Sequence, residues 1–183
     1  MRKNILHIVT FSLALRTITE SFIMTIKEYN LSVESFSDML YRFLIKNTGN
    51  KDLSGDIIQD VYLRLWEKRR LVVFENAKSY LFKMAYNRMI DYYRKEKYDE
   101  QLDNLQLSNN QNNDEFDTKA IIENALNRLP RIQKAVITLR DYEGYSYEEI
   151  GKILSLNESQ VKVYIYRGRK NLRQYLVSIE NVL

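Results

Sequence analysis

The sequence predicts an all-α chain of two small helical domains joined by an acidic linker. Apolar residues recur at helical spacing, the alternation that marks strands is scarce, and the single proline is Pro130. The linker is predicted at residues 98–118, which carry six acids and no base and are rich in Asn, Gln and Asp. A chain of 183 residues has room for two small domains.

The first domain is predicted at residues 30–97 and contains three helices. The segment 32–50 reads as one helix that ends near Gly49, and a second helix covers 52–70. A loop at 71–78 leads into a long third helix over 79–97. The stripes expected to be buried are Leu53, Ile57, Val61 and Leu65 on the second helix, and Leu81, Ala85, Met89 and Tyr92 on the third.

The second domain is predicted at residues 119–183 and ends in a helix-turn-helix pattern. Helical segments at 119–129 and 130–144 precede a short helix at 147–154, whose start is marked by the capping-box pair Ser146 and Glu149. Asn157 is expected to cap the next helix, with Gln160 at the corresponding third position. The three residues 155–157 between the two helices match the length of a helix-turn-helix turn.

The last helix carries charge of one sign, which predicts an anionic partner. Residues 162–173 contain five basic residues and no acid, whereas a solvated helix face normally mixes its signs. Helical geometry places Val161, Ile165, Gly168 and Leu172 on the inner side. The outward, DNA-reading face is predicted to hold Ser159, Val163, Tyr166, Arg167 and Lys170, with Lys162 and Arg173 flanking it. The alternative is an ordinary basic helix in a bundle.

The third helix of the first domain presents a mixed polar face. Tyr80, Lys83, Asn87, Asp91 and Arg94 share one arc of this helix. Bases stack on aromatic rings and phosphates need cations, so the arc suits single-stranded nucleic acid. With 14 tyrosines in the chain, packing of Tyr80 in the core is the competing interpretation.

The composition argues against an enzyme and predicts no catalytic residue, cofactor or metal. There is no cysteine, the one histidine is His7, and the five glycines are not clustered into a phosphate-binding loop. Asp52, Asp56 and Asp60 share one side of the second helix, which raises a carboxylate-dependent nuclease as a third hypothesis. The ordinary explanation is that acids early in a helix complement its dipole, and a protein-docking face is a further option.

Residues 1–29 are predicted to be an extension outside both domains. The run from Ile5 to Leu15 is too short to span a bilayer, and Arg16 interrupts it without a small-residue cleavage site. The preferred interpretation is that Met24 is the natural start. An amphipathic extension and a signal peptide are the alternatives.

Taken together, the segments "DLSGDIIQDVYLRLWEK", "SYLFKMAYNRMIDYYRKEK" and "LNRLPRIQKAVITLRDYEGYSYEEIGKILSLNESQVKVYIYRGRKNLR" resemble the extracytoplasmic-function (ECF) sigma factors of bacterial RNA polymerase. The resemblance covers roughly residues 30–97 and 120–176. It implies a region-two domain that docks on the polymerase clamp helices and reads the −10 element, and a region-four domain that reads the −35 element. It also implies a cytoplasmic protein and an anti-sigma partner, often membrane-anchored.

The resemblance implies roles for individual residues. Asn87 takes the position that reads a flipped −10 base, shaped by the loop from Val73 to Lys78, within a segment that also holds Tyr80, Lys83 and Arg94. Lys162, Val163, Tyr166 and Arg167 take the −35 reading positions. Asp56, Gln59, Asp60 and Trp66 lie on or beside the polymerase-docking helix, and the acidic linker follows the RNA-exit path.

The sequence departs from the family pattern at several positions. Gly151 and Gly168 stand where Ala is frequent, Tyr80 stands where Trp is usual, and "VKVY" at 161–164 replaces the common "VKSR". The leading hypothesis is a transcription initiation factor. The runner-up is a stand-alone helix-turn-helix regulator, which explains residues 120–176 but leaves the first domain without a role.

Overall fold

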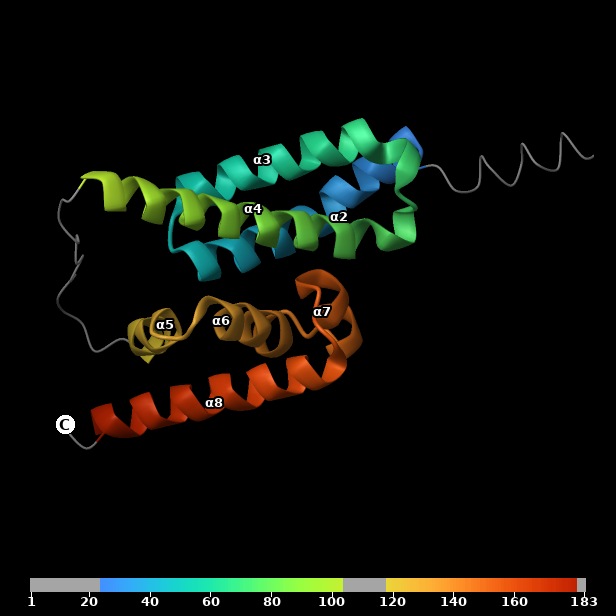
Figure 1. The fold of residues 1–183 in the computed structure, drawn as a ribbon. Coiled ribbons are helices and arrows are strands. Elements are labelled where there is room, and N and C mark those ends of the chain that lie inside the picture. Colours follow the sequence, from blue (N-terminus) through green and yellow to red (C-terminus); the bar gives the residue numbers. More distant parts are fainter. Residues whose placement is uncertain (1–23, 104–117, 181–183) are drawn as a thin grey trace, which may run out of the picture.

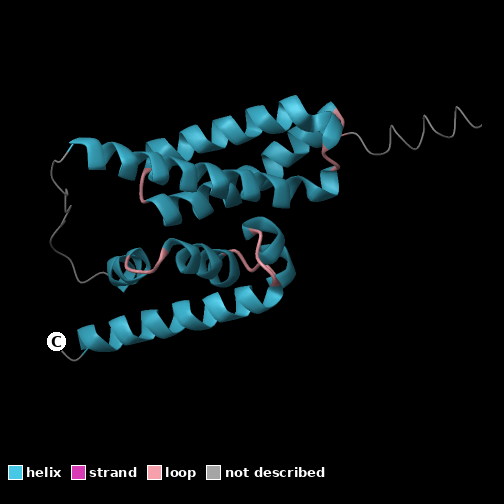
Figure 2. Cartoon of the chain, in the orientation of Figure 1, coloured by secondary structure: helices cyan, strands magenta, loops and turns pink. Residues whose placement is uncertain are grey.

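The computed structural model describes residues 24–103 and 118–180, and every regular element within those ranges is helical (Figure 2). This confirms the all-α prediction. The predictions made for residues 1–23 and for most of the acidic linker, residues 104–117, lie outside the described residues.

Three helices form the first group, which is the upper half of Figure 1. They are α2 (Ile26–Thr48), α3 (Lys51–Lys68) and α4 (Phe74–Asp103), with a short 3₁₀ turn at Arg69–Leu71 between α3 and α4. Each of the three helices packs against the other two. Their shared core is built mainly from Leu40, Phe43, Leu44, Ile57, Val61, Leu65, Leu81, Ala85 and Met89.

The second group contains α5 (Thr118–Asn127), α6 (Arg131–Ile137), α7 (Tyr147–Leu154) and α8 (Glu158–Glu180). A π-helical turn at Thr138–Tyr142 extends α6. The long helix α8 packs against α5, α6 and α7, and forms the lower edge of the molecule in Figure 1.

The two groups pack directly on one another. Helix α4 contacts α7, and α2 contacts α6 and the π-helical turn that follows it. Buried side chains from both groups form one continuous hydrophobic cluster. The described residues therefore form a single body with two layers.

The first helix starts six residues earlier than the sequence analysis predicted. Thr25 and Glu28 form a capping box: the Thr25 hydroxyl accepts from the Glu28 backbone, and the Glu28 carboxylate accepts from the Thr25 backbone at 2.7 Å. The helix ends as predicted, because Gly49 adopts a φ of 68° that glycine reaches without steric cost.

Helix α4 is longer than predicted at both ends. It begins at Phe74, so the second half of the predicted loop at 71–78 is helical, and it continues to Asp103 into the predicted linker. Of its predicted apolar stripe, Leu81, Ala85 and Met89 are buried, whereas Tyr92 is 43% exposed. Tyr92 is exposed because it lies beyond the last buried turn of the helix, where it lines a groove toward α3.

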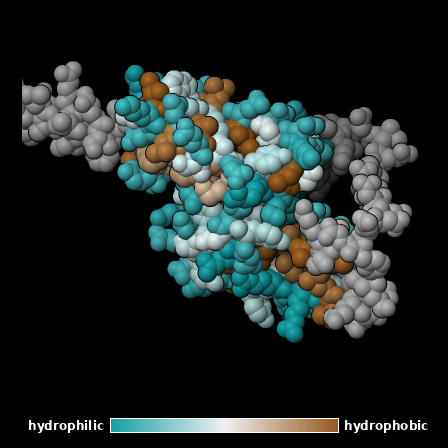
Figure 3. Space-filling view, turned by 180° about the vertical axis from the view of Figure 1, so that it is seen from behind, coloured by the Kyte–Doolittle hydropathy of each residue, from teal (hydrophilic) through white to brown (hydrophobic). Residues whose placement is uncertain are grey.

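The surface is mostly hydrophilic on the face seen in Figure 3. Apolar side chains gather on that face toward the end of the molecule where α5 packs against α8. Ile122, Leu176 and Val177 of these two helices are all more than one third exposed.

Candidate nucleic-acid and polymerase interfaces

The turn between α7 and α8 has the hydrogen bonding that the sequence predicted. The Ser146 backbone donates to the Glu149 carboxylate at 2.8 Å, and the Glu149 backbone donates to the Ser146 hydroxyl at 3.2 Å. These bonds to the carboxylate lower the pKa of Glu149. At the start of α8, Asn157 and Gln160 form the same reciprocal pair at 2.9 and 2.8 Å. Both predicted caps are confirmed.

The turn itself is closed by a backbone contact that leaves little room at Gly151. Ser155 adopts a φ of 57°, and the Leu156 backbone donates to the Gly151 carbonyl at 2.9 Å. A Cβ added at Gly151 would lie 2.7 Å from the Leu156 carbonyl oxygen. Glycine at this position therefore permits the sharp angle between the two helices.

Helix α8 lies close to α6 for a similar reason. Val161 and Ile165 are buried, and Gly168 continues the same stripe. A Cβ added at Gly168 would lie 2.9 Å from Cγ1 of Ile137. The predicted inner face of this helix is confirmed, and its opposite face is left exposed.

The outward face of α8 combines cations with two exposed side chains that have apolar surface. Val163 is 43% exposed and Tyr166 is 69% exposed. The other exposed residues of the predicted reading face are Ser159, Lys162, Arg167 and Lys170. Hydrogen-bond donors beside apolar atoms are the combination that reads base edges and thymine methyl groups in a major groove.

Two of the five cations in residues 162–173 have partners within the second group. The Lys162 ammonium lies 2.7 Å from the Glu158 carboxylate. Arg169 makes a two-point contact with Asp141, in which Nε lies 3.1 Å from Oδ2, and this hydrogen bonding raises the pKa of Arg169. Arg167, Lys170 and Arg173 have no ion-pair partner among the described residues. Helical spacing indicates the Lys162–Glu158 pair, whose members are four residues apart, whereas no local signal indicates the pairing of Arg169 with Asp141 across 28 positions.

Tyr164, one of the departures from the family pattern, does not lie on the reading face. It is half-buried and packs against the hydrophobic cluster. Burial raises the pKa of Tyr86 on α4, and the nearby Tyr164 adds to that effect. Tyr164 is therefore placed between the two groups, where it is not available to a duplex on the outer side of α8.

The polar arc on α4 is largely exposed. Lys83, Asn87 and Arg94 are exposed, and the Arg94 guanidinium lies 2.9 Å from the Asp91 carboxylate. Tyr80 is half-buried and packs against the hydrophobic cluster, as the core-packing interpretation expected. Asn87 lines a small hollow between α3 and α4 together with Arg64 and Met84.

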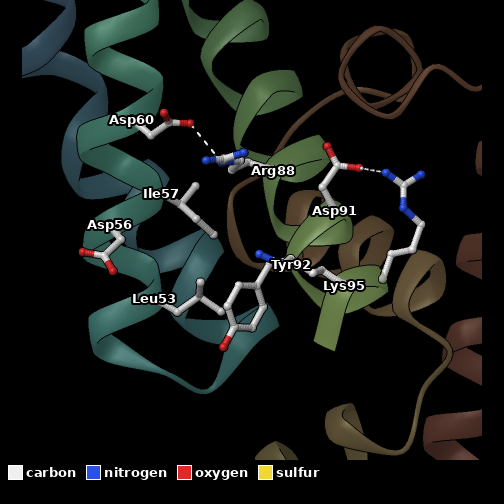
Figure 4. A pocket seen from close by; sticks show the side chains of 9 residues that line it. Leu53, Asp56, Ile57, Asp60, Arg88, Asp91, Tyr92 and Lys95 are labelled. Atoms are coloured by element: carbon white, nitrogen blue, oxygen red, sulfur yellow. Dashed lines mark hydrogen bonds and ion pairs between the residues drawn. The ribbon is translucent and has the colours of Figure 1, made fainter. Parts of the chain in front are cut away.

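A larger groove runs between α3 and α4 beside this hollow (Figure 4). Leu53, Ile57 and Tyr92 give it an apolar lining, and charged residues of both helices surround them. Across its upper end in Figure 4, the Asp60 carboxylate lies 3.1 Å from Nε of Arg88. The same oxygen lies 3.1 Å from Nε of Arg64, so Asp60 joins α3 to α4 rather than projecting freely.

The four residues expected to dock on polymerase differ in their surroundings. Asp56 and Gln59 are exposed on α3, whereas Asp60 is held by its two arginines. Trp66 is half-buried: its ring lies 5.0 Å from the ring of Tyr29, and the Arg69 guanidinium lies 4.1 Å above it. Asp56 and Gln59 are thus accessible on the surface of α3, while Trp66 packs at the end of the helix.

One further residue of α3 is exposed on this side of the helix and was not among the predicted docking residues. Leu63, four residues after Gln59, is 58% exposed. The sequence spacing could have predicted this, because residues four apart lie on the same side of a helix and Leu63 therefore shares the side of Gln59.

The three aspartates of α3 do not form a metal site. No group of three or more His, Cys, Asp or Glu residues is arranged to hold a metal ion within residues 24–103 and 118–180. In those same ranges no helix has the length and apolar character needed to cross a membrane.

Comparison with known proteins gives two family matches and several relatives. Residues 32–98 match the family described as sigma-70 region 2, and residues 119–172 match the family described as sigma-70, region 4. The chain is 31% identical over 136 residues to RNA polymerase sigma factor SigV of Bacillus subtilis (strain 168), a match that covers 73% of this chain and 81% of that protein. It is 28% identical over 156 residues to ECF RNA polymerase sigma factor SigM of the same organism, covering 82% and 94%.

The fold is also similar to that of a solved structure. The sigma factor RpoE from Bartonella quintana, in a co-crystal structure with the anti-sigma factor NepR, matches with a TM-score of 0.71 at 24% sequence identity. The match covers 82% of this chain and 98% of that one.

Proposed function

This chain belongs to the extracytoplasmic-function group of the sigma-70 family of RNA polymerase sigma factors. From that premise we propose which promoter element each of its two domains recognises. The chain is a transcription initiation factor that binds core RNA polymerase and directs it to promoters by reading −10 and −35 elements. The domain at residues 30–97 docks on the polymerase and reads the −10 element. The domain at residues 119–183 reads the −35 element.

The −35 element is read by the outward face of α8. Lys162, Val163, Tyr166 and Arg167 approach base edges, while Ser159 and Lys170 contact the backbone. The observation that supports this assignment is the exposure of Val163 and Tyr166 on the same face as the exposed cations Arg167 and Lys170, which puts apolar atoms and hydrogen-bond donors on one surface.

The −10 element is read by the exposed arc of α4. Asn87 receives an extruded base, and its position at a hollow between α3 and α4 supports this role. Lys83 and Arg94 contact the phosphates of the melted strand, and Tyr80 contributes the edge of a ring that is otherwise packed in the core.

Polymerase docking uses the exposed side of α3, through Asp56 and Gln59, with Asp60 and Trp66 holding the helix in place. Leu63 extends this side with apolar area. The acidic linker follows the RNA-exit path, and an anti-sigma protein, which can be membrane-anchored, is the proposed silencing partner. The chain has no catalytic activity of its own and acts in the cytoplasm, where the polymerase is.

Gel filtration with core RNA polymerase from the same source tests this function. We expect co-elution near equal stoichiometry that resists moderate salt, and loss of co-elution in the double variant Asp56→Lys, Gln59→Lys. Glu34→Lys, which makes the same charge reversal as Asp56→Lys at an exposed position of α2, is the control and should co-elute like the parent. Separate elution of a folded parent chain from active core would favour the stand-alone regulator.

A further inference from the structure

Val163 lies in the middle of the outward face of α8 and takes no part in the packing of the protein. It is 43% exposed, and the buried residues Val161 and Ile165 lie on the opposite side of the helix. Among the described residues, those that form or border the hydrophobic cluster include its neighbour Tyr164 but not Val163. The apolar surface of Val163 is therefore free to contact a ligand of α8.

The residues beside Val163 in the sequence do not cover it. The Lys162 ammonium lies 2.7 Å from the carboxylate of Glu158, one helical turn earlier. Tyr164 is half-buried between the two groups of helices. Both neighbours are thus engaged elsewhere, and Val163 is left open between them.

The length of the side chains on this face allows Val163 to come close to a base. Val163 is shorter than Lys162, Tyr166 and Arg167, the other side chains proposed to approach base edges. The small Ser159, one turn before Val163, does not hold the helix away from its target. A major groove admits an α-helix. A short side chain in the middle of the face can therefore reach the floor of the groove while the longer ones reach toward its sides.

The chemistry of Val163 restricts what it can recognise there. Its side chain has no hydrogen-bonding atom, so it can contribute to base readout only through apolar contact. Of the groups that base pairs present in the major groove, the 5-methyl group of thymine is the apolar one. Opposite any other base edge, Val163 would displace water from donors or acceptors and offer no hydrogen bond in return, which is unfavourable.

Val163 also loses little freedom when it makes such a contact. A β-branched side chain in a helix has one strongly preferred χ1 rotamer, so its two methyl groups are already fixed before binding. The cost of ordering a side chain at an interface is correspondingly small for valine.

We propose that Val163 selects a thymine in the −35 element by packing its methyl groups against the thymine 5-methyl group in the major groove. This inference rests on the proposed function, because it requires α8 to enter that groove. Serine, which is common at this position in the family pattern, carries a hydroxyl that can read a polar base edge instead. The −35 preference of this chain should therefore differ at one base pair from that of relatives with serine.

Replacing thymine with uracil tests the proposal, because it removes the methyl group and changes nothing else on the base edge. Selection from duplexes randomised over the −35 region, with the chain bound to core polymerase from the same source, gives the preferred element. Each thymine of that element is then replaced in turn by deoxyuridine. At one position we expect the parent complex to bind about three- to five-fold more weakly, the value of one buried methyl group.

Variants of the chain assign this effect to Val163. Val163→Ser should bind the thymine and uracil duplexes equally, and Val163→Thr, which keeps the branched shape and one methyl group, should show a reduced difference. Val177→Ser is the matched control, because Val177 is also on α8, is 46% exposed and lies beyond the reading face. It should respond to uracil like the parent. Co-elution with core polymerase should be unchanged in all three variants.

The outcomes separate this inference from the function on which it rests. An element in which no thymine responds to uracil, or a response that is equally large in Val163→Ser and Val163→Thr, would overturn the role of Val163. A persistent response would instead belong to another side chain of the face, such as Tyr166. A parent that binds core polymerase but selects no −35 sequence would contradict the proposed function itself.

Discussion

Replacing Tyr145 with phenylalanine should stabilise this protein. The Tyr145 side chain is 2% exposed, and its hydroxyl has no hydrogen-bond partner among the described residues. Burial raises the pKa of Tyr145, so the hydroxyl stays protonated at neutral pH. Tyr145→Phe removes this oxygen and keeps the ring that packs against Phe82 at 5.2 Å.

The magnitude follows from the cost of burying a polar group without a partner. That cost is about 1–3 kcal/mol, so its removal should raise the free energy of unfolding by about 1–2 kcal/mol after some loss of packing. For a chain of this size each kcal/mol corresponds to a rise in Tm of about 2–4 °C. Urea denaturation followed by circular dichroism gives the free energy, and a thermal scan gives the Tm.

Tyr62→Phe is the matched control, because its hydroxyl is fully engaged. It donates to the Ser32 carbonyl at 3.1 Å and accepts from the Ser37 hydroxyl at 3.1 Å. The control should lose about 1–2 kcal/mol. If Tyr145→Phe lost stability by a similar amount, the Tyr145 hydroxyl would have to be hydrogen-bonded in solution, and the argument from desolvation would be refuted.

Three further predictions concern the reading faces, a buried lysine and the tight turn. Arg167→Ala should weaken binding of the full chain to a −35 duplex by about 1–3 kcal/mol in a titration. Asn87→Ala should leave co-elution with core polymerase unchanged and lower transcription. Normal transcription by both variants would contradict the assignments. Burial lowers the pKa of Lys134 from 10.5 to about 8, so the unfolded chain binds this proton more tightly than the folded one. The free energy of unfolding should therefore rise by about 2 kcal/mol between about pH 7.5 and 9.5. Lys134→Met should abolish this rise. Gly151→Ala gains about 1 kcal/mol of helix propensity but meets the Leu156 carbonyl at 2.7 Å, so we expect a net loss of about 1–2 kcal/mol; a gain measured by denaturation would show that the turn relaxes freely.

Local features of this fold could be predicted from the sequence because their signals lie within a few residues. The pairs Ser146–Glu149 and Asn157–Gln160 form as expected, and Val161 and Ile165 are buried as their spacing required. The capping box of Thr25 and Glu28 was equally local, and recognising it would have placed the start of α2 correctly. The outward face of α8 was predictable for the same reason.

Contacts between distant residues could not be predicted in this way. The Arg42–Glu143 pair joins residues 101 positions apart, and Lys134 meets Asn47 across 87 positions. Nothing in the periodicity of α2 or α6 indicates which charge will find a partner in the other group. Tyr164 shows the same limit: the sequence marked it only as a departure from the family pattern, whereas its environment relates it to packing between the groups.

The internal pairing of Lys162 and Arg169 has a consequence for the salt dependence of DNA binding. Each phosphate that a protein neutralises releases condensed counterions, so affinity falls with salt with a slope of about −0.9 per phosphate contacted. Five cations in residues 162–173 would give a slope of about −4.5. A cation that leaves the carboxylate of its ion pair to contact a phosphate frees that carboxylate, which then takes up a counterion from solution. The net number of counterions released is therefore close to zero. With Glu158 and Asp141 holding two of the five, the slope contributed by this helix should be no steeper than about −2.7, the value for three cations that all contact phosphates, and it should be shallower to the extent that Arg167 contacts a base edge instead.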